Sequence, residues 1–200
     1  RYTVRYTLTV QPTNNRAQIL RAALDLFASR GYDASGVKEI VEAVGITKPT
    51  LYHYFGSKQG LLDALLTEHS CDFLRDLEAA ARYEGNLPVT LDRVVAVYLA
   101  FAAAQPAFCR FLLSLLFAPP ASDAHGPAAR VTEAQRQLLE AMFQAASRDH
   151  GNMRGWHTQY AWSLLGVLAA YMLLVVNQQL EPTARLRRDI VRKFSHGIYS

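Results

Sequence analysis

The stretch of sequence that decides the fold is GITKPTLYHYFGSK, which spans residues 45–58. Gly45 can adopt the left-handed backbone conformation that ends many helices. Thr47 can then cap a new helix, and Pro49 fits its first turn because a backbone N–H at that position has no partner. Ser57 can cap the helix that follows. The stretch therefore predicts a short helix that begins at Thr47 and has a turn on each side.

Two further helices are predicted upstream of Gly45, because apolar residues recur there at helical spacing. The first ends at Gly31, and the second is capped by Ser35. The apolar faces are Ile19, Ala22, Ala23, Leu26 and Phe27 in the first helix and Val37, Ile40, Val41 and Val44 in the second. Three such helices with a tight turn at Gly45 are typical of a helix-turn-helix, which reads DNA with the N-terminal residues of its last helix.

The predicted DNA-binding residues lie on the outward face of the third helix and around the ends of the helices. They are Ser35, Thr47, Lys48, Pro49, Thr50, Tyr52, His53, Tyr54 and Lys58. None is acidic, and a carboxylate there would repel phosphate. Threonine hydroxyls can bind phosphates or base edges, Lys48 can bind a phosphate or guanine, and His53 can donate to either. The tyrosines and Lys58 are expected on the DNA backbone, whereas Leu51 faces the core.

The charge distribution is consistent with a polyanionic partner but does not require one. The first 60 residues hold eight Lys/Arg and four Asp/Glu, whereas residues 61–200 hold 13 of each, so the formal charge of +4 lies entirely in the first part. A small basic excess is a weak indication of nucleic-acid binding. Periodicity alone leaves open an ordinary three-helix packing unit, or a helical protein-interaction module that does not bind DNA.

The segment Ile19–Leu62 resembles the N-terminal domain of the TetR family of transcriptional regulators. The matching residues are the ILRAALDLF run at 19–27, Gly31-Tyr32, Ile40, and the run at 45–58 with its Leu-Tyr-x-x-Phe-x-Ser-Lys core. Departures from the family pattern are Val41 and Val44 in place of frequent alanines, Tyr54 in place of the usual His, and Gly36 in place of Ser or Thr. The resemblance implies a homodimer that represses transcription and releases DNA when a small molecule binds.

The remainder of the chain is predicted to be helical. The expected helices span residues 88–104, 106–117, 128–148, 154–179 and 183–196, with a Pro/Gly loop at 118–127. The fold class is thus all-α with about nine helices. A flexible arm is expected at residues 1–12, a three-helix helix-turn-helix domain at 13–60, and a larger helical ligand-binding and dimerisation domain at 61–200.

The most apolar segment lies between residues 155 and 180, where no charged residue occurs when His is counted as neutral. Its length would suit a transmembrane helix, but polar residues shorten its apolar part and no second span is evident. We therefore expect a soluble helix that is buried on all sides. One face would pack on the protein's own core, and the other would pair with a second copy. The last helix, with Leu186, Ile190 and Phe194 on one seam, is expected to join this homodimer interface.

A small-molecule inducer pocket is predicted among the middle helices, with large aromatic walls and few polar groups. The candidate lining residues are Tyr98, Phe101, Phe108, Phe111, Trp156, His157, Tyr160 and Asn177. Because the set is rich in aromatics and poor in charge, the ligand is expected to be apolar or aromatic.

Enzymatic activity is the rival class of function, and the sequence gives it little support. No two His or Cys residues have metal-ligand spacing, and no nucleophile elbow, phosphate-binding loop or dinucleotide fingerprint occurs. We therefore expect no catalytic residues, no metal and no cofactor. The two cysteines, Cys71 and Cys109, do not make a disulfide framework, so a reducing cytoplasm is the expected location.

Overall fold

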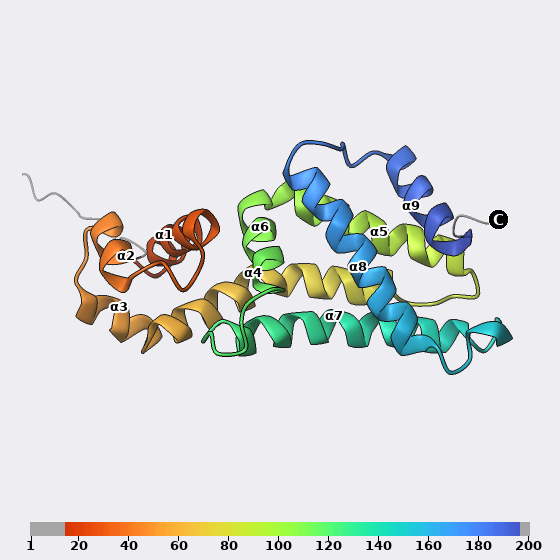
Figure 1. Cartoon of the computed structure of the whole chain (residues 1–200), viewed down its shortest axis with the longest axis horizontal. Coiled ribbons are helices and arrows are strands. Elements are labelled where there is room, and N and C mark those ends of the chain that lie inside the picture. Colours follow the sequence, from red (N-terminus) through yellow and green to blue (C-terminus); the bar gives the residue numbers. More distant parts are fainter. Residues whose placement is uncertain (1–14, 197–200) are drawn as a thin grey trace, which may run out of the picture.

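The computed structural model describes residues 15–196, and within that range it contains nine α-helices, one short 3-10 helix and no strand (Figure 1). The helices are α1 Asn15–Arg30, α2 Val37–Val44, α3 Lys48–Phe55, α4 Lys58–Ala80, α5 Leu87–Ala104, α6 Pro106–Leu115, α7 His125–Ala146, α8 His157–Val176 and α9 Ala184–His196, and the 3-10 helix is η1 Gly151–Met153. The all-α prediction is confirmed. The predicted arm at residues 1–12 lies outside the described residues.

The helices α1 to α3 form a separate group at one end of the molecule (Figure 1). The predicted turns are confirmed, because Gly31 and Gly45 have φ values of +84° and +75°. The Gly45 N–H donates to the Val41 carbonyl oxygen at 2.9 Å and so ends α2. Leu51 from α3 and Ile40 from α2 are fully buried in this group. The sequence pattern thus produced the expected helix-turn-helix geometry.

Helix α4 connects this group to the remainder of the molecule without a break. Its N-cap Ser57 accepts a hydrogen bond from the Gly60 N–H at 2.9 Å. Leu61 and Leu65 are fully buried in the half that contacts α1 and α3. Further along, Phe73 stacks on Phe101 of α5 with a centroid distance of 4.4 Å. One helix therefore belongs to both packing groups, and it crosses the domain boundary predicted at residue 60.

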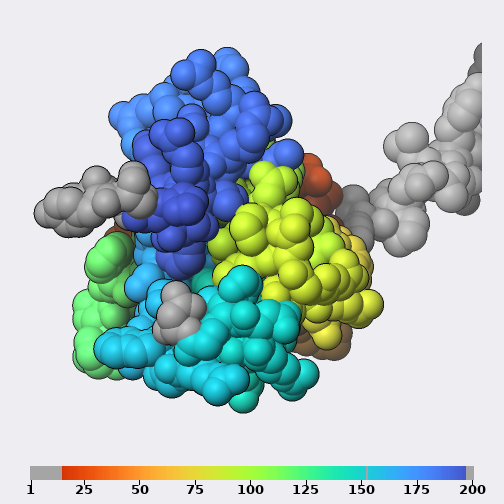
Figure 2. All heavy atoms as spheres, turned by 90° about the vertical axis from the view of Figure 1, so that its right-hand side faces the viewer, coloured from red at the N-terminus to blue at the C-terminus, as the bar shows by residue number. Residues whose placement is uncertain are grey.

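The larger group consists of α5 to α9 and the second half of α4. Helix α8 crosses α5 and α7 diagonally, and α9 packs on α5 (Figure 1). Figure 2 looks onto the end of the molecule opposite the helix-turn-helix, where α5, α7 and α9 lie together. Phe143 of α7 joins two neighbours in this region, with centroid distances of 5.5 Å to Tyr160 and 6.1 Å to Phe194.

Two helices begin three residues away from their predicted starts, for reasons that involve proline and glycine. Helix α7 begins at His125, inside the predicted loop 118–127, because Pro127 lies in its first turn, where a missing N–H has no cost. Helix α8 begins at His157 and not at 154, because Gly155 takes a φ of +81° just before it. In each case the proline or glycine helps to determine where the helix begins, but the start lies at a different position from the one we assigned.

In the single chain, the apolar segment near α8 is buried on one face only, and the expected burial of its other face against a second copy stays a prediction. Leu164, Leu168 and Met172 face the core, but Trp162 and Leu173 on the opposite side are 51% and 45% exposed. Among the described residues, α5 and α8 are long and apolar enough to cross a membrane by length and composition. Both contact several other helices of the bundle. The exposed face of α8 therefore requires a separate explanation.

Candidate functional site

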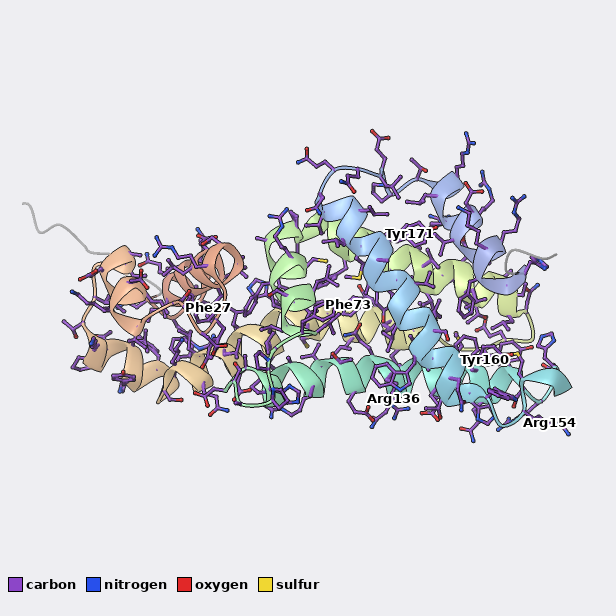
Figure 3. All side chains as sticks on the ribbon, viewed as in Figure 1. Phe27, Phe73, Arg136, Arg154, Tyr160 and Tyr171 are labelled. Atoms are coloured by element: carbon purple, nitrogen blue, oxygen red, sulfur yellow. The ribbon has the colours of Figure 1, made fainter. Side chains whose placement is uncertain are left out.

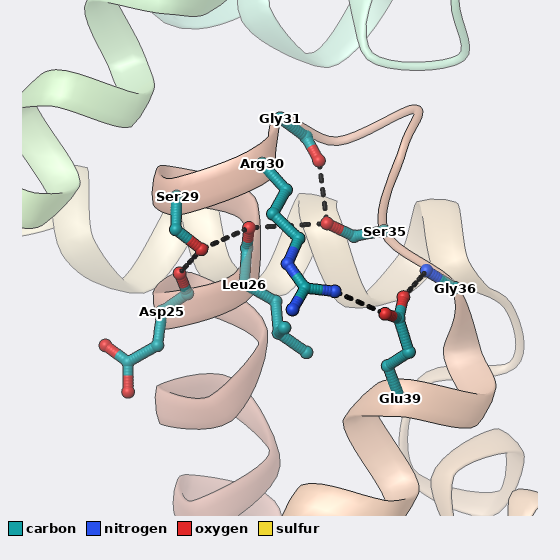
Figure 4. Close-up of polar contacts among 8 residues, drawn as sticks. All are labelled: Asp25, Leu26, Ser29, Arg30, Gly31, Ser35, Gly36 and Glu39. Carbon is teal, nitrogen blue, oxygen red and sulfur yellow. Dashed lines mark hydrogen bonds and ion pairs between the residues drawn. The ribbon is translucent and has the colours of Figure 1, made fainter.

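The turn between α1 and α2 is fixed by a buried hydroxyl. Ser35 is 1% exposed, and its Oγ donates to the carbonyl oxygen of Gly31 at 2.7 Å and approaches that of Leu26 at 3.3 Å (Figure 4). The N-cap of α2 is Gly36, not Ser35. Two expectations for Ser35 are therefore corrected: its side chain neither caps α2 nor reaches the surface where DNA would lie.

The start of α2 is stabilised by Glu39 from within its own first turn. Its Oε2 accepts the Gly36 N–H at 2.9 Å, and its Oε1 forms an ion pair with Arg30 at the end of α1 (Figure 4). The Gly36 N–H, and next to it the Arg30 guanidinium, lower the pKa of Glu39 below its usual range. Because Gly36 has no side chain, Glu39 supplies the capping interaction that Ser35 was expected to make.

The outward face of α3 presents most of the predicted DNA-binding side chains to solvent. The exposed members are Thr47, Lys48, Pro49, Tyr52, His53 and Tyr54, and Thr50 is half-buried. Thr47 is the N-cap, and its Oγ1 lies 3.0 Å from the Oγ1 of Thr50. The His53 and Tyr54 rings make an edge contact at 5.6 Å. Hydroxyls, an ammonium group and an imidazole thus share one face that contains no carboxylate.

Lys58 has a different environment from the one we predicted. Its Nζ donates to the carbonyl oxygen of Tyr32 at 2.6 Å and lies 4.1 Å from the centroid of the Tyr32 ring. Burial lowers the pKa of Lys58, although the nearby Asp33 and Asp123 partly offset this effect. Lys58 therefore joins the first turn of α4 to the α1–α2 turn. Its expected role as a free phosphate ligand is corrected.

Arg16 holds α1, α3 and α4 together, and the sequence analysis did not single it out. Its guanidinium lies 5.5 Å from the centroid of the Phe55 ring and pairs with Glu68. The partner is 52 positions away along the chain, so no local pattern marks the interaction. A cation–π contact together with an ion pair fixes the end of α3 against the helices behind it.

A cavity of about 700 Å³ lies between α5, α6, α7 and α8. Its lining residues are Tyr98, Leu112, Leu113, Leu115, Leu116, Phe117, His125, Ala128, Ala129, Thr132, Glu133, Gln135, Trp162, Leu165, Gly166, Ala169 and Met172. The volume falls within the usual range for small-molecule sites. Small residues of α8, Gly166 and Ala169, leave space that larger side chains would fill.

Of the eight predicted pocket residues, only Tyr98 lines this cavity. Phe101, Phe108 and Phe111 are buried elsewhere, in ring contacts with Phe73, His69 and Phe27. Trp156, His157 and Tyr160 lie at the start of α8, and Asn177 lies just beyond its end. We selected large side chains as walls, but a cavity forms where side chains are small. In the sequence, the small residues Gly166 and Ala169 in a helix of mostly large side chains could have indicated the position of the cavity.

The deepest polar groups of the cavity are Tyr98 and Gln135. Both side chains are buried, and the Tyr98 hydroxyl donates to Gln135 Oε1 at 3.0 Å. The Gln135 amide donates in turn to the Val131 carbonyl oxygen of its own helix at 3.2 Å. Burial raises the pKa of Tyr98, so its hydroxyl remains protonated.

The loop between α6 and α7 connects the cavity wall with the helix-turn-helix. Ser122 in this loop donates to Asp33 in the α1–α2 turn at 2.9 Å. One turn into α7, Arg130 pairs with Asp63 of α4. Helix α6 also touches α1 directly, because the rings of Phe111 and Phe27 lie 5.6 Å apart. Movement of the cavity wall can therefore reach the first helix by two routes.

Within residues 15–196, no group of three or more His, Cys, Asp or Glu side chains is placed to hold a metal ion. Cys109 is buried, Cys71 is exposed, and both are free thiols.

The three packed helices, the glycine turn and the exposed face of α3 define a helix-turn-helix unit. Residues 19–65 match the family model described as bacterial regulatory proteins, tetR family. The activator FasR from Mycolicibacterium smegmatis is 32% identical over 136 residues, which cover 68% of this chain and 60% of FasR. The repressor AcnR from Corynebacterium glutamicum is 40% identical over 58 residues, or 29% of this chain and 31% of AcnR. Each match thus spans less than two thirds of the curated relative.

A likeness to solved structures extends over nearly the whole chain. The transcriptional regulator FadR from Bacillus subtilis, solved in complex with stearoyl-CoA, superposes with a TM-score of 0.76. The alignment covers 92% of this chain and 99% of FadR at 18% identity. A TetR-like transcriptional regulator from Rhodococcus sp. RHA1 gives a TM-score of 0.70 at 22% identity over 92% of this chain. At these identities the likeness establishes the shared helical fold, including the larger group of helices.

Proposed function

We propose that the chain is a ligand-responsive transcriptional regulator of the cytoplasm, which binds a palindromic DNA operator as a homodimer and represses transcription. The observation that carries the proposal is the outward face of α3, where exposed donors surround the helix N-terminus and no acid is present. The helix N-terminus adds backbone N–H groups that favour phosphate. The match of residues 19–65 to the tetR family model supports the same conclusion.

The proposed contacts differ from the sequence-based set in two places. Thr47, Lys48, Pro49, Thr50 and His53 are assigned to base edges and adjacent phosphates, because they lie on the first two turns of α3 or at its cap. The exposed hydroxyls of Tyr52 and Tyr54 are assigned to the DNA backbone. The buried Ser35 and the tethered Lys58 are removed from the set.

Dimerisation would explain the exposed apolar side of α8. Trp162, Gly166, Ala170 and Leu173 are all exposed and recur at helical spacing along one face. A two-fold axis beside this face would bury it against its own copy, as isologous dimers do. Such a dimer would place two α3 helices on one face of DNA, about 34 Å or a multiple of that apart. The apolar seam of α9, which was expected in the interface, packs inward instead: Ile190 is fully buried and the Phe194 ring lies 6.1 Å from the Phe143 ring, so the proposed interface rests on α8.

We further propose that a largely apolar molecule in the cavity weakens DNA binding. The cavity wall includes the C-terminal half of α6, and α6 contacts α1 through Phe111 and Phe27. A displaced α6 would tilt α1 and change the separation of the two α3 helices. FadR, which shares the fold, was solved in complex with stearoyl-CoA, and the long acyl chain of that molecule supports a ligand with an apolar part. Among the curated relatives are both an activator and a repressor, and we assign repression here.

Selection of bound sequences from a random double-stranded DNA library tests this function. The expected product is a two-fold symmetric sequence, because a symmetric dimer reads two identical half-sites. The matched control is Thr47→Asp, since aspartate is also a good N-cap but its carboxylate repels phosphate. This variant should fold normally and enrich nothing. Absence of any enriched sequence with the unmodified protein would overturn the proposal.

A further inference from the structure

The chemistry of the cavity between α5 and α8 restricts the kind of molecule that can occupy it. This inference rests on the proposed function, because it concerns the same ligand site. Most of the wall is aliphatic or aromatic and comes from α6 and α8. Besides the Tyr98 hydroxyl, the ionisable groups among the lining residues are Glu133 and His125. No Lys or Arg side chain lines the cavity.

Glu133 makes the rim unfavourable for an anionic head group. Its carboxylate accepts hydrogen bonds from Arg136 and Gln137, which lower its pKa to about 2, so it is ionised at any physiological pH. Arg136 is shared with a second carboxylate, Glu140, and this three-residue group therefore carries one net negative charge. The other nearby guanidinium, Arg130, is paired with Asp63. A phosphate or carboxylate would find no unpaired cation there.

The remaining basic side chain of the lining is His125, which is exposed, and its Nδ1 lies 3.2 Å from the Ala118 carbonyl oxygen, to which it can only donate. Water around an exposed ring weakens its attraction for a charged head group. For a cation, the carboxylates of Glu133 and Glu140 are already partnered by Arg136, which projects from α7 (Figure 3). The lining therefore offers neither an unpaired guanidinium or ammonium group nor an unpaired carboxylate.

The floor of the cavity, in contrast, offers one specific polar contact. Gln135 Oε1 accepts the Tyr98 hydroxyl and, like any amide oxygen, can accept a second hydrogen bond. The amide nitrogen uses one hydrogen for Val131 and has a second. A buried amide of this kind can bind either a hydroxyl or a carbonyl group, and it penalises a ligand that brings neither.

We propose that the cavity binds an uncharged amphiphile, with an apolar chain or ring system against α6 and α8 and one hydroxyl or carbonyl group hydrogen-bonded to Gln135. Tyr98 orients the amide and so determines which of its atoms faces the ligand. Gln135 is thus the specificity-determining residue of the site, and charged carriers of an acyl chain are excluded by the carboxylate at the rim.

A competition experiment with matched chains tests the charge preference. The reporter is 1,6-diphenylhexatriene, a hydrocarbon that fluoresces in apolar surroundings, bound to the full-length protein. Four competitors with a ten-carbon chain are compared: 1-decanol, decanoate, decyltrimethylammonium and decanoyl-CoA. Decanol is expected to displace the reporter at a concentration at least tenfold lower than the other three require. Equal or tighter binding of decanoate or decanoyl-CoA would overturn the proposal, and so would a reporter that does not bind.

Variants of the polar pair test the hydrogen bond. The double variant Tyr98→Phe/Gln135→Leu removes both partners at similar volume, so that no buried polar group is left alone. Its affinity for decanol should fall about tenfold, while its affinity for diphenylhexatriene should not fall, because a hydrocarbon gains nothing from the amide. Thr132→Val is the matched control, because the Thr132 hydroxyl lines the same cavity but is bonded to Ala128 of its own helix. Unchanged decanol affinity in the double variant, or an equal loss for both molecules, would contradict the role of Gln135.

The inference and the proposed function can fail separately. If decanol binds as described but leaves affinity for the selected operator unchanged, ligand-controlled release is wrong and the assignment of the cavity stands. If decanoyl-CoA releases the operator and decanol does not compete with it, the assignment of the cavity is wrong and the regulatory function stands.

Discussion

Gly60 lies in the first turn of α4, directly beside the end of α3. A methyl group on its Cα would overlap the Phe55 carbonyl oxygen, which is backbone and cannot rotate away. Gly60→Ala is therefore expected to lower the free energy of unfolding by about 1–3 kcal/mol, measured by urea denaturation. The close approach of α3 and α4 thus depends on a position that has no side chain.

The control for this prediction is Gly126→Ala, in the first turn of α7. A Cβ at Gly126 meets only the tip of the Arg130 side chain, at 3.9 Å, so the change removes mainly backbone freedom and should leave the stability unchanged or raise it by up to about 1 kcal/mol. If both variants gain stability to the same extent, the close contact at Gly60 is not significant.

The contacts of Ser35 and Lys58 could not be predicted from the sequence around them. Both are polar residues at helix ends, and both were assigned to the DNA surface on that basis. In the structure both side chains make contacts within the protein. Ser35 stabilises a turn, and Lys58 donates to the Tyr32 carbonyl oxygen. Their partners depend on how α1 and α4 pack, which local patterns do not determine. Thr47 and Lys48 were placed correctly on the exposed face because they belong to the single helix that the motif defines.

At the scale of one element, α2 depends on Glu39 and therefore on pH. The folded protein holds the pKa of Glu39 below its ordinary value of 4.5, so the ionised carboxylate stabilises the fold above that pH. The contribution disappears as the pH falls from about 4.5 through the lower folded-state pKa. Glu39→Gln keeps an acceptor for the Gly36 N–H but loses the charge that pairs with Arg30.

Urea denaturation of the protein and of Glu39→Gln between pH 7 and pH 3 measures this effect. The unmodified protein should be the more stable of the two at pH 7, and the difference should shrink as the pH falls below 4.5. Parallel curves over the whole range would show that the capping carboxylate contributes nothing through its charge.

The loop between α6 and α7 should transmit the state of the cavity to the helix-turn-helix. Ser122→Ala removes the hydrogen bond to Asp33 and also the one that Ser122 Oγ accepts from the Ala124 N–H just before α7, while Ser122 itself neither lines the cavity nor belongs to α3. We expect the factor by which saturating decanol weakens operator binding to fall about threefold, within the range of coupling changes seen for single residues. The measurement is fluorescence anisotropy of labelled operator with and without decanol.

Ser195→Ala on the exposed side of α9 is the control for that measurement, because it removes a hydroxyl far from both sites. An identical response of the Ser122 and Ser195 variants would indicate that coupling runs through α6 and α1 alone.

The helices themselves were largely predictable, because apolar periodicity and the glycines at 31 and 45 act locally. The cavity was not. It depends on where α8 crosses α5 and α7, and on small side chains that leave volume unfilled. Periodicity indicates which face of a helix is apolar. It does not indicate where the side chains of neighbouring helices leave an empty volume between the helices. Seven of the eight predicted pocket residues therefore lie outside the cavity.

At the scale of the whole molecule, the exposed face of α8 decides the oligomeric state. Leu173→Glu places a charge on that face and should convert a dimer into a monomer in sedimentation velocity experiments at micromolar concentration. Leu116→Glu is a matched control, because both leucines are 45% exposed but Leu116 lies off α8, just beyond α6. A dimer that persists in Leu173→Glu, or one lost equally in both variants, would place the interface elsewhere.

The central claim is that the exposed face of α3 binds DNA, and the salt dependence of operator binding tests it most directly. Each phosphate contact contributes about 0.9 to the slope of log K against log salt concentration. Lys48→Ala should lower that slope by about 0.9 for each protomer. Lys58→Met should lower thermal stability and leave the slope unchanged, because the Lys58 ammonium is held by Tyr32. A slope that falls for Lys58→Met and not for Lys48→Ala would contradict the account.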